Sequence, residues 1–179
     1  MRKELLLLVA VLIVLLMAPA VQAADGPDLS GTWVLDKEKS DPIRMGFGRG
    51  RGPGGGQDSS PPDIDVTLSI SQSENQLMLT RKFNMDGRER TQEQTFTLDG
   101  EENINPGLMG RGELTSKSQW KESKLVIEGF QVVSTPNGEF EIGSIEEYSL
   151  SEDGKVLTLR ATRATPRGEQ SSTQVFNKQ

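Results

Sequence analysis

The chain contains no cysteine and no histidine among its 179 residues. The absence of cysteine excludes disulfides and a lipid anchor on an N-terminal cysteine. The absence of histidine excludes Ser-His-Asp and Cys-His catalysis, and it removes the most frequent zinc and copper ligand. Carboxylates, lysines, hydroxyl groups and a single tyrosine, Tyr148, remain as candidates for any chemistry. We therefore predict no catalytic residue, no cofactor and no metal site, and a protein that is not an enzyme.

Long apolar runs are confined to the N-terminus. Residues 5–17 are all apolar, they follow the basic residues Arg2 and Lys3, and small residues precede Ala24. This is the three-part pattern of a signal peptide, and 13 apolar residues are too few for a membrane-spanning helix, which needs about 20. We predict that residues 1–23 are a cleaved signal peptide and that the mature protein is extracytoplasmic, either periplasmic or secreted. An uncleaved N-terminal anchor is the alternative; after cleavage no stable membrane anchor remains.

The predicted mature chain, residues 24–179, carries an excess of acidic side chains. Its net charge is −7, from 18 basic and 25 acidic residues. An acidic domain of this kind disfavours a nucleic-acid partner or an anionic membrane surface. The length suits one domain with its own core.

Apolar and polar residues alternate with a period of two through the mature chain, and helical periodicity is nearly absent. This pattern is typical of half-buried strands. It predicts an all-β domain over residues 24–179, a single antiparallel meander of about eight strands closing into a barrel. Two segments do not fit the pattern: residues 43–62 form a predicted flexible Gly/Arg/Pro-rich loop, and residues 99–112 a second loop.

The first predicted strand carries a Gly-x-Trp motif at Gly31 and Trp33. This motif resembles the opening of lipocalins and their calycin relatives. The longer string of residues 29–41 is similar to a group of small exported bacterial proteins with lipocalin-like β domains, whose function is uncharacterised. The resemblance implies a structural role for both residues: the tryptophan closes one end of the barrel, and the glycine lets the backbone bend around it.

The chain departs from the lipocalin pattern near its end. Lipocalins usually place an arginine there, stacked on the tryptophan. After Arg167 this chain has only Lys178, so the resemblance leaves Arg160 or Arg163 as substitutes.

Several polar residues share a strand face with large apolar ones. Gln92 and Gln94 share the face of Phe96, and Ser116 and Ser118 share the face of Trp120. An unpaired polar group costs several kcal/mol in a solid apolar core, whereas a ligand-lined barrel interior tolerates it. The alternation therefore indicates a polar-lined cavity.

The alternation leaves a second interpretation open, in which bulges reset the register and turn polar side chains toward solvent. Ile145 breaks the alternation of its strand and predicts a bulge near Gly143. By parity Arg81 and Glu146 could pair inside the cavity, but the sequence favours a surface position for both.

The function predicted from these features, together with the lipocalin resemblance, is binding without catalysis. The ligand is a small apolar or amphipathic molecule inside the barrel. Parity selects the candidate ligand-binding residues Leu79, Phe83, Phe96, Ser118, Trp120, Ile142 and Tyr148.

Two other functional classes stay open. One is a module that binds an extracytoplasmic protein, such as a periplasmic protease inhibitor, with residues 24–28 or 43–62 as its plug. The other is an enzyme that uses carboxylates alone, which requires two buried carboxylates facing each other across a cleft. Neighbouring glutamates on one strand do not establish that geometry.

Overall fold

The computed structural model describes residues 26–43, 63–107, 112–135, 138–165 and 168–179. The predicted signal peptide and nearly all of the predicted loop 43–62 lie outside these residues. A search of the described residues for a helix long and apolar enough to cross a membrane finds none.

Ten antiparallel strands form one sheet in the described part of the chain, which confirms the all-β class and gives two strands more than the sequence count. Their bounds are β1 (Gly31–Leu35), β2 (Ile64–Gln72), β3 (Gln76–Met85), β4 (Arg88–Thr97), β5 (Asp99–Pro106), β6 (Glu113–Lys121), β7 (Lys124–Thr135), β8 (Gly138–Leu150), β9 (Val156–Thr165) and β10 (Gly168–Lys178).

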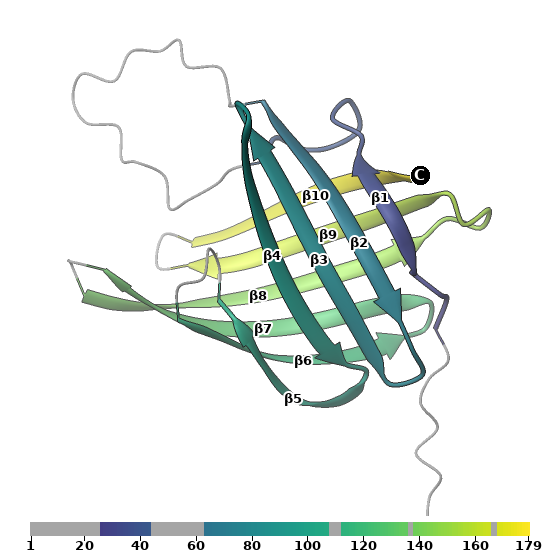
Figure 1. The fold of residues 1–179 in the computed structure, drawn as a ribbon. Coiled ribbons are helices and arrows are strands. Elements are labelled where there is room, and N and C mark those ends of the chain that lie inside the picture. The colour runs from purple at the N-terminus through teal and green to yellow at the C-terminus, as the bar shows by residue number, and fades with distance from the viewer. Residues whose placement is uncertain (1–25, 44–62, 108–111, 136–137, 166–167) are drawn as a thin grey trace, which may run out of the picture.

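Each strand pairs with the next one along the chain from β5 to β10 and from β1 to β4, and β1 pairs with both β2 and β10. The sheet order is β4-β3-β2-β1-β10-β9-β8-β7-β6-β5, so β4 and β5 are its two edges. In Figure 1, β1 to β4 run steeply across β6 to β10. The sheet thus curls into a nearly closed barrel whose interior lies between these two halves.

The two edges of the sheet meet through one side chain. Asn105 on β5 is buried, its Oδ1 accepts a hydrogen bond from the Thr95 N–H of β4 at 2.7 Å, and its Nδ2 donates to the Thr95 carbonyl at 2.8 Å. The amide group therefore takes the place of one residue of a backbone ladder. We call this junction of β4 and β5 the seam.

β5 corrects the predicted loop over residues 99–112, because Asp99–Pro106 is a strand. The segment escapes the alternation rule for two reasons: it is an edge strand with few apolar residues, and its register shifts between Asp99 and Glu102. The predicted bulge near Gly143 is also wrong. β8 pairs with β7 without a shift from Ser149 to Gly138, and Ile145 simply faces outward.

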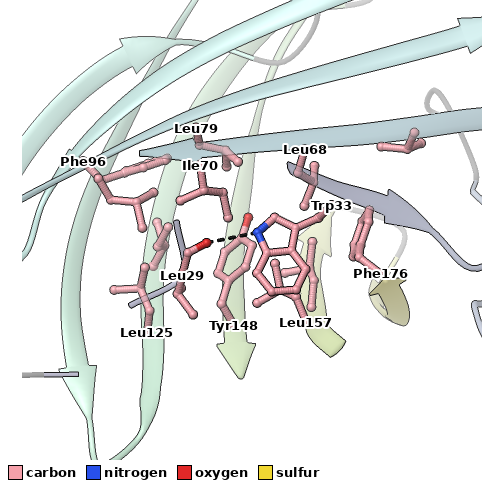
Figure 2. Packing of buried hydrophobic residues seen from close by; sticks show 14 of the residues in the cluster. Leu29, Trp33, Leu68, Ile70, Leu79, Phe96, Leu125, Tyr148, Leu157 and Phe176 are labelled. Atoms are coloured by element: carbon pink, nitrogen blue, oxygen red, sulfur yellow. Dashed lines mark hydrogen bonds between the residues drawn. The ribbon is translucent and has the colours of Figure 1, made fainter. Parts of the chain in front are cut away.

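Apolar side chains fill one end of the barrel, which we call the core end. Figure 2 shows Trp33 at its centre, with Tyr148, Phe176 and Leu157 around the ring. The Trp33 Nε1–H donates to the Leu29 carbonyl at 3.0 Å. The residues before β1 thus fold back over the end of the barrel and close it.

The Gly-x-Trp motif lies at this closure. Gly31 has a φ of 140°, in the region that favours glycine, and a Cβ there would lie 3.0 Å from the Lys178 side chain. The Lys178 Nζ lies 5.1 Å from the centroid of the Trp33 ring. Lysine therefore supplies the cation–π contact for which the resemblance suggested Arg160 or Arg163.

Candidate functional site

A cluster of three polar side chains crosses the barrel interior next to the core end. β3 supplies Arg81, and β8 supplies Glu146 and Tyr148 on its inward face. The Arg81 Nη1 donates to Glu146 Oε1 at 3.4 Å, and Nη2 contacts both Glu146 Oε2 and the Tyr148 hydroxyl. The Tyr148 hydroxyl in turn donates to Glu146 Oε2 at 2.8 Å. The preferred surface position of Arg81 and Glu146 is therefore wrong, since the two residues pair inside the barrel.

Electrostatic interactions within this cluster keep both Arg81 and Glu146 charged, and the two charges neutralise each other. Burial opposes the charged form of Glu146, but the Arg81 charge and its hydrogen bonds outweigh burial and hold the Glu146 pKa below its ordinary value. Burial likewise acts to lower the pKa of Arg81, and the Glu146 charge more than reverses this effect. Burial raises the pKa of Tyr148 well above its usual range, so its hydroxyl stays protonated.

A pocket of about 30 Å³ adjoins this cluster on the side away from the core end. A space of this size holds about two water molecules. Two apolar side chains and six polar or charged ones line it: Leu114, Ile142, Arg81, Gln94, Gln131, Ser144, Glu146 and Arg163. The pocket is therefore lined mainly by polar and charged residues, whose carbon atoms and two apolar side chains also give it apolar surface. We call this half of the interior the polar end.

Arg163 and Gln94 are two further polar side chains of the pocket lining. Arg163 on β9 makes no hydrogen bond or ion pair with the rest of the described chain, although its charge acts on Glu146. Gln94 on β4 is buried and also lines the pocket. The Arg163 guanidinium is therefore available to a molecule that enters the pocket.

Several buried nitrogen and oxygen atoms of side chains in the described part of the chain have no hydrogen-bond partner. Within the described residues they are Arg81 Nε, Gln92 Nε2, Thr97 Oγ1, Ser116 Oγ and Ser118 Oγ. All belong to β3, β4 or β6, the strands beside the seam. Parity correctly predicted that Gln94, Ser116 and Ser118 are buried. Burying hydroxyl groups without partners is costly, which makes this interior unlike a solid core.

The seven predicted ligand-binding residues divide between the two ends of the barrel. Leu79, Phe96, Trp120 and Tyr148 belong to the apolar cluster of the core end, and Phe83 packs against it. Ser118 is fully buried, and Ile142 lines the pocket. Their role in ligand binding stays a prediction.

Sequence reasoning missed Arg163, Ser144 and Gln131 as pocket residues. The same parity rule finds them, because Arg163 shares the face of Leu159, and Ser144 that of Ile142. Among the described residues no group of three or more acidic, cysteine or histidine side chains is placed to hold a metal ion. Glu146 faces an arginine and a tyrosine, which differs from the facing carboxylates that a glycosidase-type site requires.

Neither a family model nor a curated protein sequence matches this chain. Solved structures do match its fold. A zebrafish ileal bile acid-binding protein complexed with cholic acid has a TM-score of 0.55 and 14% identity, over 84% of this chain and 98% of that one. A protein named REP1-NXSQ fatty acid transporter has a TM-score of 0.52 and 13% identity, over 85% of this chain and 96% of that one.

A third similar structure is secretory abundant heat soluble protein 4 from Ramazzottius varieornatus, with a TM-score of 0.50 and 14% identity, over 86% of this chain and 96% of that one. At these identities the likeness concerns the fold alone. This chain is therefore built like the β-barrels of these proteins, in agreement with the lipocalin-like architecture expected from Gly31 and Trp33.

Proposed function

We propose that this protein is an exported, non-catalytic binding protein that holds a small apolar or amphipathic molecule in its barrel. The observation that carries the proposal is the polar end, where six polar or charged side chains line a pocket inside the sheet and one of them, Arg81, keeps a buried Nε without a hydrogen-bond partner in the described chain. A folded chain keeps such groups only where a bound molecule or water satisfies them. Two structural neighbours, a bile acid-binding protein complexed with cholic acid and a protein named fatty acid transporter, agree with this function.

The packing restricts where the molecule binds. Trp33, Phe176 and Leu157 are completely buried and fill the core end. The site is therefore at the polar end, with Ile142 and Leu114 as its apolar contacts. The pocket of about 30 Å³ is far below the roughly 300 Å³ of an ordinary ligand site. Binding thus requires side chains of the polar end to move apart, or part of the molecule to stay outside.

The test uses the protein purified after export from a bacterial host, so that N-terminal sequencing first checks cleavage before Ala24. The protein is incubated with a lipid extract, passed through gel filtration, and its bound molecules are identified by mass spectrometry. We expect bound amphipathic molecules on the wild type. Ile142→Trp fills the pocket and should abolish binding. The matched control is Ile145→Trp, which lies on the same strand and faces outward. A wild type without bound molecules would refute the proposal.

A second candidate function, binding of an extracytoplasmic protein, is favoured by the outer surface of the sheet. Four apolar side chains there are between 42% and 60% exposed, namely Ile104, Phe130, Val132 and Ile145. Ile104 and Phe130 flank Thr115 in one row across β5, β6 and β7. By contrast the predicted plug is engaged in its described part, because the Pro27 carbonyl accepts a hydrogen bond from Gln72. Cross-linking in the exporting host tests this candidate: Phe130→Ser should remove the cross-linked protein, and Met78→Ser, an exposed apolar control on β3, should not.

A further inference from the structure

We infer that Arg163 determines the ligand class: it holds an anionic group of the bound molecule at the polar end, while the deeper Arg81 remains paired with Glu146. This inference rests on the proposed binding function and narrows it to anionic amphipathic molecules.

The charges that line the pocket do not cancel. Arg81 and Arg163 are cationic, Glu146 is the anionic group of the lining, and the remaining lining residues are neutral. The pocket is therefore positive by one charge, inside a protein with a net charge of −6. A positive pocket in a negative molecule selects for an anion at that place, because the local field and not the net charge acts on a bound group.

The excess charge belongs to Arg163 and not to Arg81. Arg81 is 7% exposed, and two of its nitrogens already contact Glu146 and Tyr148. A ligand anion that displaced Glu146 would leave a carboxylate buried without a partner, which is strongly unfavourable. Arg163 acts on Glu146 through its charge but makes no hydrogen bond or close ion pair among the described residues, and it lies half-buried at the pocket.

The strand register explains how Arg163 reaches the pocket. On β9 it faces inward beside Ser144 of β8, and Ser144 lies beside Gly129 of β7. A Cβ at Gly129 would lie 2.8 Å from the Ser144 Oγ and 3.0 Å from Leu114, so glycine keeps this row clear of a further side chain. The space beside Arg163 has room for about two waters, which the two oxygens of one carboxylate could replace. Gln94 lies across the pocket as an additional hydrogen-bond donor.

The experiment compares two probes of the same shape, octanoate and octanamide, which differ in charge. Each is titrated into the exported full-length mature protein, and the dissociation constant is measured from NMR chemical shifts. The wild type should bind octanoate about tenfold more tightly than octanamide, because a hydrogen bond to a charged group is stronger than one between neutral groups. Arg163→Gln should remove this preference, so that the dissociation constants of the two probes become nearly equal. Arg160→Gln, an exposed arginine on the same strand, is the matched control and should keep the preference.

A second variant separates the two arginines. Glu146→Gln removes the partner of Arg81 at nearly constant volume, and it should increase the ratio by which octanoate binds more tightly than octanamide. Equal binding of both probes to the wild type would overturn the assignment of Arg163 and leave the binding function standing. A preference for octanoate that survives Arg163→Gln would also overturn it. Binding of neither probe would contradict the proposed function itself, and the inference with it.

Discussion

Arg81 determines the character of the barrel interior more than any other residue, because it places a positive charge there. The chain neutralises this charge with a buried carboxylate instead of keeping the arginine at the surface. The residue is 7% exposed, and its guanidinium pairs with Glu146. Buried ion pairs contribute little net stability, whereas breaking one leaves an uncompensated charge. The pair therefore separates the core end of the barrel from the polar end. Each of its two charges is tolerated in the interior only because the other is present.

This dependence gives a double-mutant prediction. Arg81→Met alone leaves Glu146 buried without its cation and should lower the free energy of unfolding by about 3–5 kcal/mol. The double variant Arg81→Met, Glu146→Leu removes both charges at similar volume and should recover most of this loss. Urea unfolding followed by tryptophan fluorescence measures both values. Equal losses in the single and double variants would show that the pair is not coupled.

Gly26 sets the position of the chain before β1. A Cβ at this residue would lie 1.9 Å from the nearest atom of the Trp120 ring, which no side chain permits. Gly26→Ala should therefore displace the segment that closes the core end and destabilise the protein by about 1–3 kcal/mol. Thermal unfolding by circular dichroism measures the shift in Tm. Gly143→Ala is the control, because its Cβ would lie 3.8 Å from Ala164, and it should unfold like the wild type.

At the scale of the strands, the seam between β4 and β5 is the point where the barrel depends on a side chain for closure. The two hydrogen bonds between Asn105 and Thr95, one accepted and one donated by the Asn105 amide, stand in for a backbone ladder. One side-chain amide constrains two strands much less than a continuous ladder does, so we expect local opening here before elsewhere.

Hydrogen exchange can test the seam directly. Asn105→Ala removes the acceptor of the Thr95 N–H, and exchange at this amide should become at least about fivefold faster, since one lost hydrogen bond is worth about 1 kcal/mol or more. Amides in the β8–β9 ladder should keep their protection. Asn103→Ala is the control, because Asn103 contacts Asn105 but not Thr95. Unchanged exchange of the Thr95 amide in Asn105→Ala would show that backbone contacts close the seam.

The alternation rule predicted most strands but not all of them. It works for β2, where buried Val66 and Leu68 alternate with more exposed residues, because one face of this strand meets the core. It fails for β5, whose inward residue Asn105 is polar and whose outward residue Ile104 is apolar. The rule assumes that inward-facing residues are apolar. At the seam the inward-facing residue is Asn105, whose side-chain amide makes the hydrogen bonds that a neighbouring backbone would otherwise make.

At the scale of the whole molecule, parity located the polar interior but could not show that its members meet. Arg81 and Glu146 are 65 residues apart, and only closure of the sheet brings β3 and β8 face to face. A charged residue on a strand is more often exposed than buried, so the sequence favoured the wrong position. The division into a filled core end and an open polar end is likewise a property of the packed barrel, since both ends use the same strands.

The closure of the whole barrel depends on its last residues. β1 lies between β2 and β10, and its register places Trp33 beside Lys178 and Leu35 beside Phe176. Phe176 is completely buried in the core end, so its loss alone should cost about 3–5 kcal/mol. A chain that ends at residue 175 therefore also leaves β1 with one neighbour only, and we expect it to remain unfolded.

Removal of Gln179 alone provides the control for this truncation, because it deletes only one backbone hydrogen bond, from the Gln179 N–H to the Thr32 carbonyl. That variant should fold and unfold cooperatively, with a Tm within a few degrees of the wild type. Circular dichroism and the dispersion of the NMR spectrum distinguish the two cases. β1 can pair with β10 only when the last residues of β10 are present. A folded chain ending at residue 175 would therefore mean that pairing with β2 alone holds β1 in place. It would also mean that the two halves of the sheet are stable independently.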